Sequence, residues 1–176
     1  MEFETKVQFL TQPEHNRRTI VISDIHGHRA WLEKLLKKVD FSEKDILIIV
    51  GDMIEKGSES LNTIRYIMEL CEKYTVYPMM GNVDLWRIQM LLTEDGSLDQ
   101  ELYETNERMR QYWKATFFQD LCREAGVSVK TPEEIPAARE AVLAKFQKEL
   151  TFMKELPTIL VTPAFTFVHG GLVHEK

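Results

Sequence analysis

The stretch Thr19-Ile20-Val21-Ile22-Ser23-Asp24-Ile25-His26-Gly27 decides the fold of this chain. Its first half is short, continuous and rich in β-branched residues, which predicts a buried strand over 19–23. Its second half places the carboxylate of Asp24 two residues before the imidazole of His26, where that strand ends. In an open α/β sheet, ligands bind outside the carboxyl ends of the strands. The stretch therefore predicts an α/β fold with a ligand site at one edge of its sheet.

Three more polar groups, each beside a glycine, follow apolar stretches of their own. They are Gly51-Asp52 after residues 45–50, Gly81-Asn82 after residues 75–80, and His169-Gly170-Gly171 after residues 165–168. Taken singly, they have simpler explanations, such as a helix cap, a left-handed turn or a hairpin end. Their occurrence together at strand ends favours a metal site, because carboxylate, imidazole and amide groups are all metal ligands. Asp52 could also bridge two ions through its two oxygens.

The segments between these strand ends have helical periodicity. Apolar residues at helical spacing predict amphipathic helices over 28–39 and 58–74. Strands and helices that alternate with short joins predict parallel strands with right-handed crossovers, and helices on both faces of the sheet. Residues 1–18 are polar and irregular, and are expected to form a short strand or a loose arm.

The alternation stops after Asp84. We expect a helix over 84–93, a turn over 94–99, a polar loop over 127–136 and a helix over 137–154, which together suggest a helical insertion at about 94–155. Two apolar strands, 158–162 and 165–168, are expected to form a hairpin. An aromatic series lies at helical spacing within the insertion and is better explained as core than as a base-stacking platform: Tyr103, Met109, Tyr112, Trp113, Phe117 and Phe118.

Length and composition indicate one globular domain over residues 1–176. The net charge of −6 argues against a general nucleic-acid binder, but not against a small phosphorylated substrate. The cysteines, Cys71 and Cys122, form no CxxC pair and are expected to be reduced, as in a cytoplasmic protein. We find no secretory signal, and no apolar run of roughly 18 residues that would span a membrane.

The chain stops at Lys176, shortly after His169. An α/β unit that stops just past an apolar strand is expected either to lack part of its sheet or to have a sheet edge covered by a partner. Apolar edge strands near 158–168 would also favour self-association.

The four motifs carry a family resemblance. The runs Ser-Asp-Ile-His-Gly, Gly-Asp-Met-Ile-Glu-Lys-Gly, Gly-Asn-Val-Asp and Val-His-Gly-Gly-Leu resemble, in order, those of the calcineurin-like metallophosphoesterases. The most similar branch is that of the phosphoprotein phosphatases and their bacterial relatives, which include diadenosine tetraphosphate hydrolases. The resemblance runs from about residue 19 to residue 173, and Leu156-Pro157 also resembles this branch. It implies a mixed β-sheet sandwich flanked by helices, here without its C-terminal part.

The resemblance implies a site with two divalent ions, for which Mn²⁺, Fe and Zn²⁺ are all suitable. Asp24, His26 and Asp52 would hold one ion, and Asp52, Asn82 and His169 the other, with Asp52 as the bridge. A metal-activated water would hydrolyse a phosphate ester or phosphoanhydride, in a phosphoprotein or a nucleotide. A further family histidine, expected downstream, is not matched by His174, whose spacing differs.

The chain departs from the family pattern beside these ligands. Val83 stands where the family has the histidine that is thought to protonate the leaving group, so Glu55 loses the residue that it would orient. Lys56 replaces a phosphate-binding arginine and keeps its charge without the two-pronged guanidinium. His28 and Asp84 are candidate replacement proton donors, although each has a simpler explanation, as a first-turn helix residue and a helix cap respectively.

The predicted function is therefore metal-dependent hydrolysis of a phosphate ester or anhydride. The alternative is a regulatory module that binds metal or phosphate without turnover, and Val83 is the residue in its favour. A general acid typically raises the rate by ~10²–10⁴-fold. Its loss would therefore lower the rate least for substrates with good leaving groups.

Overall fold

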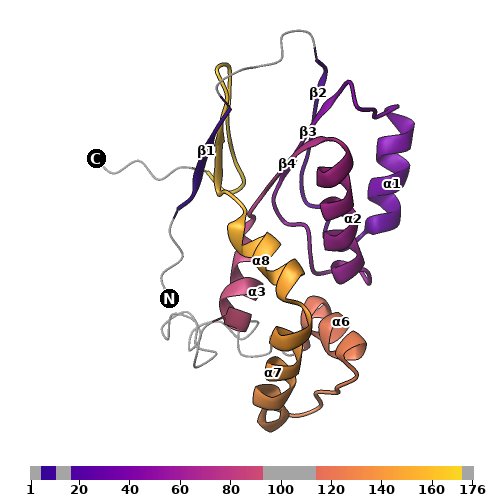
Figure 1. The fold of residues 1–176 in the computed structure, drawn as a ribbon, viewed down its shortest axis with the longest axis vertical. Helices are drawn as coiled ribbons and strands as arrows, with labels where there is room; N and C mark the ends of the chain where they lie inside the picture. Colours follow the sequence, from indigo (N-terminus) through magenta and orange to yellow (C-terminus); the bar gives the residue numbers. More distant parts are fainter. Residues whose placement is uncertain (1–4, 11–16, 93–113, 172–176) are drawn as a thin grey trace.

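The computed structural model describes residues 5–10, 17–92 and 114–171, which form two small sheets and a set of helices (Figure 1). The strands are β1 (Val7–Phe9), β2 (Thr19–Ile22), β3 (Ile46–Val50), β4 (Thr75–Met79), β5 (Ile159–Val161) and β6 (Thr166–Val168). The helices are α1 (Arg29–Lys38), α2 (Ser60–Lys73), α3 (Asn82–Leu92), α6 (Thr116–Ala125), α7 (Ile135–Lys145) and α8 (Gln147–Glu155), with a short 3-10 turn, η2, at Pro132–Glu134. The predicted α/β class is confirmed.

The first sheet has the order β2-β3-β4, and its strands are all parallel. β3 is the central strand, and its residues Leu47, Ile48 and Ile49 are almost completely buried. The near-continuous apolar sequence of β3 follows from this position, because a central parallel strand is covered on both faces. The predicted parallel arrangement is confirmed, and so are the strands and helices expected between residues 19 and 80.

The two faces of this sheet are covered by different kinds of element. Leu47 and Ile49 pack in the large core that α1 and α2 share, whereas Ile48 points the other way and packs with Met79 and Leu160. Leu160 belongs to β5, so the second face is covered by the second sheet (Figure 1). The prediction of helices on both faces is therefore wrong, and the sandwich implied by the family resemblance is the arrangement found.

The second sheet joins segments from both ends of the described chain. β1 pairs with β5 in parallel, and β5 pairs with β6 in an antiparallel hairpin. The amide of Leu10 donates to the carbonyl of Val161 at 2.8 Å, and the amide of Thr158 donates to the carbonyl of Lys6 at 2.9 Å. The predicted hairpin is confirmed, and the first 18 residues do contain a short strand.

The helical segment after residue 113 differs from its prediction. One helix was expected over 137–154, but the structure breaks it at Phe146, whose φ and ψ are −109° and 31°. The ring of Phe146 is buried and lies under the guanidinium of Arg65, 5.8 Å from the ring centroid. The break lets α7 and α8 turn around this buried ring, so tertiary packing overrides local helix propensity.

Other expectations for the insertion are settled only in part. Phe117 and Phe118 of α6 are buried, as the core explanation predicted. The turn at 94–99 and the aromatic residues between Tyr103 and Trp113 lie outside the described residues. Cys71 and Cys122 are free, and burial raises the pKa of each thiol to about 11. No helix in the described part of the chain has the length and hydropathy that crossing a bilayer requires.

Candidate metal centre

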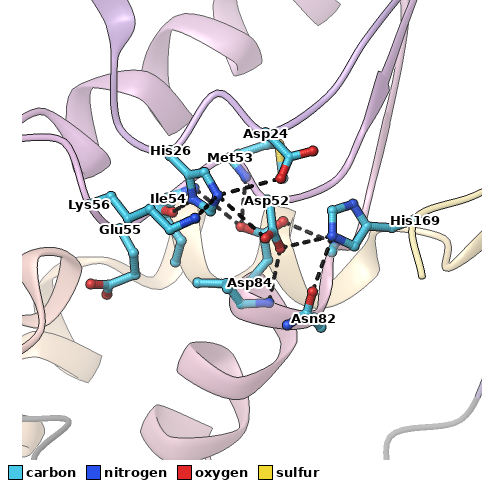
Figure 2. A network of polar contacts seen from close by, with 12 residues as sticks. Asp24, His26, Asp52, Met53, Ile54, Glu55, Lys56, Asn82, Asp84 and His169 are labelled. Carbon is cyan, nitrogen blue, oxygen red and sulfur yellow. Dashed lines mark hydrogen bonds and ion pairs between the residues drawn. The ribbon is translucent and has the colours of Figure 1, made fainter. Parts of the chain in front are cut away.

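Three polar side chains meet at the carboxyl ends of β2 and β3 (Figure 2). They are Asp24, His26 and Asp52, and each offers one ligand atom within 4.8 Å of the others. Nε2 of His26 lies 3.5 Å from Oδ1 of Asp24 and 3.6 Å from Oδ2 of Asp52. His26 and Asp52 are buried, whereas Asp24 is exposed, so a cation could reach the group from the side of Asp24.

A second group shares Asp52 with the first. Nε2 of His169 lies 3.1 Å from Oδ1 of Asn82 and 3.4 Å from Oδ1 of Asp52. Asn82 begins α3 and His169 follows β6, so this group joins segments that are far apart in the sequence. The two carboxylate oxygens of Asp52 thus face different groups, Oδ2 toward His26 and Oδ1 toward His169. Such a carboxylate can bridge two ions.

Both histidines are held by backbone carbonyls in the manner of metal ligands. Nδ1 of His26 lies 3.0 Å from the carbonyl oxygen of Ile54, and Nδ1 of His169 lies 2.7 Å from that of Val50. An N–H at Nδ1 donates to the carbonyl and leaves the lone pair of Nε2 facing the site. Metal-bound histidines almost always have such a partner for their second nitrogen. The site therefore fits divalent cations with mixed oxygen and nitrogen ligands.

Close backbone contact between two strand ends explains the glycines here. A Cβ on Gly81 would overlap the amide nitrogen and Oδ1 of Asp52. A Cβ on Gly51 would lie 2.5 Å from the Cα of Gly81, and the φ of Gly51 is +70°. Only glycine lets the ends of β3 and β4 approach closely enough for Asp52 and Asn82 to face one site.

Asp84 lies behind this surface and is completely buried. Its carboxylate accepts hydrogen bonds from the amides of Met53 (2.9 Å), Ile54 (3.3 Å) and Gly81 (3.0 Å). Burial raises the pKa of Asp84 to about 6, although the bond from Gly81 acts in the opposite direction. These bonds tie the loop after β3 to the end of β4, which is a structural role.

The other two predicted site residues are exposed. Nζ of Lys56 lies 2.6 Å from Nε2 of His26, so its positive charge sits at the edge of the first group. His28, just before α1, lines a hollow of about 520 Å³ together with Asp24 and Trp31. A second hollow, of about 390 Å³, lies beside Asn82 and His169. Both groups are thus open to a bound molecule.

Comparison with known families gives a match over most of the chain. A family model described as calcineurin-like phosphoesterase matches residues 17–174, which include all the side chains of both groups. The chain belongs to the calcineurin-like phosphoesterases.

Relatives of this calcineurin-like phosphoesterase match it over part of its length. A protein of Shewanella loihica named "Bis(5'-nucleosyl)-tetraphosphatase, symmetrical" is 46% identical over 68 residues, which are 38% of this chain and 24% of the relative. A Coxiella burnetii protein of the same name is 33% identical over 92 residues, which are 52% of this chain and 30% of the relative. The matched segments thus cover less than a third of either relative.

Solved structures with the same fold include a candidate diadenosine tetraphosphatase. It is 24% identical to this chain, with a TM-score of 0.58 over 96% of this chain and 56% of the other. A cold-active protein tyrosine phosphatase is 16% identical, with a TM-score of 0.53 over 98% of this chain and 45% of the other. These likenesses show the fold, and this calcineurin-like phosphoesterase spans about half the length of those chains.

Some residues that shape the site were not expected from the sequence. The carbonyls of Val50 and Ile54 orient the two histidines, and backbone acceptors leave no trace in residue identity. Arg87 of α3 pairs with Glu55 at 3.0 Å. In the sequence, this pair is indicated only by the position of Arg87, five residues after Asn82. An arginine within a helix is too common for that position to be informative.

Proposed function

We propose that this chain hydrolyses a phosphate ester or phosphoanhydride with two divalent metal ions. The observation that carries this proposal is the position of Asp52, whose two oxygens face His26 on one side and His169 on the other. A single ion would need only one of these groups. Two ligand groups that share one carboxylate are what a two-metal site of about 3.5–4 Å requires.

In this proposal Asp24, His26 and Asp52 hold one ion, while Asp52, Asn82 and His169 hold the other, and Mn²⁺, Fe and Zn²⁺ all suit these ligands. Bound ions lower the pKa of a water and stabilise charge on the transferring phosphoryl group. The chain itself orients both imidazoles through backbone carbonyls. Lys56 places an ammonium beside His26, where it can bind a phosphate oxygen.

The two candidate proton donors differ in their access to a substrate. Asp84 is completely buried and uses its oxygens to hold three backbone amides, so we propose a structural role for it. His28 is exposed in the hollow that Asp24 also lines, and it keeps the proposed role of donor to the leaving group. Val83, at the place of the family histidine, carries no proton to donate.

For the substrate we propose a phosphorylated nucleotide, with a phosphoprotein as the alternative. Relatives named symmetrical bis(5'-nucleosyl)-tetraphosphatases support the nucleotide. The hollows beside the two groups leave room for substituents on either side of a phosphate. A single domain over 1–176 is supported by the contacts of α6 and α8 with α2. A cytoplasmic location is supported by the free cysteines.

The test compares two aspartates at opposite ends of β3. Asp52→Asn removes the bridging charge, whereas Asp45→Asn makes the same change at a buried residue just before the strand begins. We expect Mn²⁺-dependent release of phosphate from p-nitrophenyl phosphate, and nucleotide release from a bis(5'-nucleosyl) tetraphosphate, to disappear in Asp52→Asn and to persist in Asp45→Asn. Activity that survives Asp52→Asn, or that ignores EDTA, would contradict the proposal.

The second candidate function is a regulatory module that binds metal or phosphate without turnover, and Val83 favours it. The two functions differ in one measurement. The regulatory module predicts stoichiometric Mn²⁺ binding, lost in Asp52→Asn, together with no phosphate release from any substrate tested.

A further inference from the structure

The hydrogen-bond partners of Glu55 differ from the one that the family resemblance implies. The family resemblance places here a carboxylate that orients a histidine, but the position of that histidine is Val83. Glu55 is nevertheless buried, with only 8% of its surface exposed. Figure 2 shows its side chain pointing away from the group formed by Asp24, His26 and Asp52. A buried carboxylate needs hydrogen-bond donors, and these identify what Glu55 does.

The carboxylate of Glu55 accepts four hydrogen bonds from two helices. Oε1 accepts from Nε of Arg87 in α3 at 3.0 Å and from the amide of Phe117 at 3.3 Å. Oε2 accepts from the amide of Thr116 at 3.0 Å and from its hydroxyl at 3.1 Å. The N-cap residue of α6, Ala115, has no capping side chain, so Glu55 satisfies the first amides of that helix from outside it.

The residues on either side of Glu55 both contact His26. The carbonyl of Ile54 lies 3.0 Å from Nδ1 of the ring, and Nζ of Lys56 lies 2.6 Å from Nε2. The amide of Gly57 donates to the carbonyl of His26 at 2.8 Å. The loop at residues 54–57 therefore contacts both ring nitrogens and the carbonyl of His26. Glu55 lies between the two residues that contact the ring.

The loop needs such an anchor because its backbone is strained. Glu55 and Lys56 have φ values of +70° and +64°, a region that side-chain-bearing residues rarely occupy. Such a conformation persists only where the surroundings impose it. The four hydrogen bonds of Glu55 to α3 and α6 contribute to imposing it here, together with the bond from the Glu55 amide to the hydroxyl of Ser60 at 3.0 Å.

We propose that Glu55 is a positioning residue, which uses α3 and α6 as a fixed frame to hold the carbonyl of Ile54 against Nδ1 of His26 and to keep Lys56 beside the site. The inference rests on the proposed metal site and extends it, because it makes the start of α6 part of the support of that site. The carboxylate of Glu55 is bonded to Arg87, Thr116 and Phe117, none of which is a proposed metal ligand. Glu55 acts through the residues beside it.

The test uses Glu55→Gln and a matched control, Glu149→Gln. Glu149 is equally buried at 8% and also pairs with an arginine, Arg65, at 2.7 Å, but it lies in α8. Both variants remove the charge of a buried carboxylate that pairs with an arginine, so both should lose thermal stability. Only Glu55→Gln should weaken Mn²⁺ binding, by about tenfold, which is the usual cost of disturbing the partner of a metal-bound histidine.

A second measurement is independent of metal. In the metal-free protein, the ring nitrogens of His26 should give NMR signals of one tautomer, with the proton on Nδ1. We expect Glu55→Gln to mix the tautomers and Glu149→Gln to leave them unchanged. If the wild-type protein binds no Mn²⁺, the proposed function fails, and the His26 signals still decide the role of Glu55.

A purely structural role for Glu55 predicts the opposite pattern. Glu55→Gln would then lose stability as Glu149→Gln does, while its Mn²⁺ affinity and its His26 signals stayed as in the wild type, and the proposal would be overturned. If Glu55→Gln does not fold, Arg87→Gln removes one donor and leaves the bonds to α6 in place. It should shift the His26 signals in the same direction, and unchanged signals would equally overturn the proposal.

Discussion

At the scale of single residues, the candidate metal centre is built from unusual backbone conformations. Asp24, His26 and Asp52 have φ values of +56°, +48° and +53°, and the neighbouring Glu55 and Lys56 are also positive. Left-handed geometry costs a side-chain-bearing residue roughly 1–2 kcal/mol. Four of these side chains lie at the site and the fifth, Glu55, binds α3 and α6. Backbone strain of this kind is typical of functional sites.

Lys56 allows the strain to be measured apart from the charge. Lys56→Gly and Lys56→Ala both remove the ammonium beside His26, but only glycine relieves the φ of +64°. We expect Lys56→Gly to be more stable than Lys56→Ala by about 1 kcal/mol in urea unfolding. Equal stabilities, or a more stable alanine variant, would mean that the loop relaxes freely and stores no strain at this residue.

At the scale of elements, β3 is anchored at its beginning as well as at its functional end. Asp45, just before the strand, accepts from Nε and Nη2 of Arg18 at 2.9 Å each and from the amide of Ser42 at 2.9 Å. Arg18 precedes β2, so this pair ties the starts of two neighbouring strands together. This contact stabilises the beginning of both strands, at the end opposite the candidate metal centre.

The Asp45 anchor has a defined dependence on pH. The bond from Arg18, together with that from Ser42, lowers the pKa of Asp45 to about 2. A carboxyl group with a lowered folded-state pKa stabilises the fold above its unfolded pKa, here 3.8, and loses this effect as the pH falls through about 2. We therefore expect Asp45→Asn to lower the melting temperature at pH 7, with a difference from wild type that shrinks between pH 4 and pH 2. If the difference in melting temperature stays constant over this range, the lost stability comes from packing and not from the charge of Asp45.

Much of this architecture could be predicted from the order of elements. The β-branched strands and amphipathic helices between residues 19 and 80 are local patterns, and the rule that ligands gather at strand ends brought Asp24, Asp52 and Asn82 together. The break at Phe146 could not be predicted, because it depends on a buried ring under Arg65 of a distant helix. The partners of Glu55 could not be predicted either, because Thr116 is separated from it by 61 residues in the sequence.

At the scale of the whole molecule, the edge strands of both sheets matter for association between chains. Among the described residues, β2 pairs only with β3, and β6 pairs only with β5. Large apolar side chains lie exposed near the second sheet, with Phe9 at 66% and Phe165 at 68% exposure. Exposed backbone groups beside apolar side chains favour strand pairing between chains.

We therefore propose that this chain associates with itself through β6. Light scattering should give a mass above the 20.6 kDa of one chain, and Phe165→Lys should return it to that value, because a lysine at an edge opposes strand pairing. Phe9→Lys serves as the comparison, because it places the same charge on β1, which is the opposite edge of the same sheet. A wild-type mass of one chain at high protein concentration would dismiss the association.

The pairing of β1 with β5 also affects the order in which the two sheets can form during synthesis. Val7 pairs with Ile159, so the first strand emerges from the ribosome long before its partner has been synthesised. At 5–20 residues per second, this interval is roughly 8–30 s. The β2-β3-β4 sheet can assemble from local segments within that interval, while β1 remains a free apolar segment. Synthesis rate and chaperone capture of the nascent chain therefore bear on whether the sandwich closes correctly.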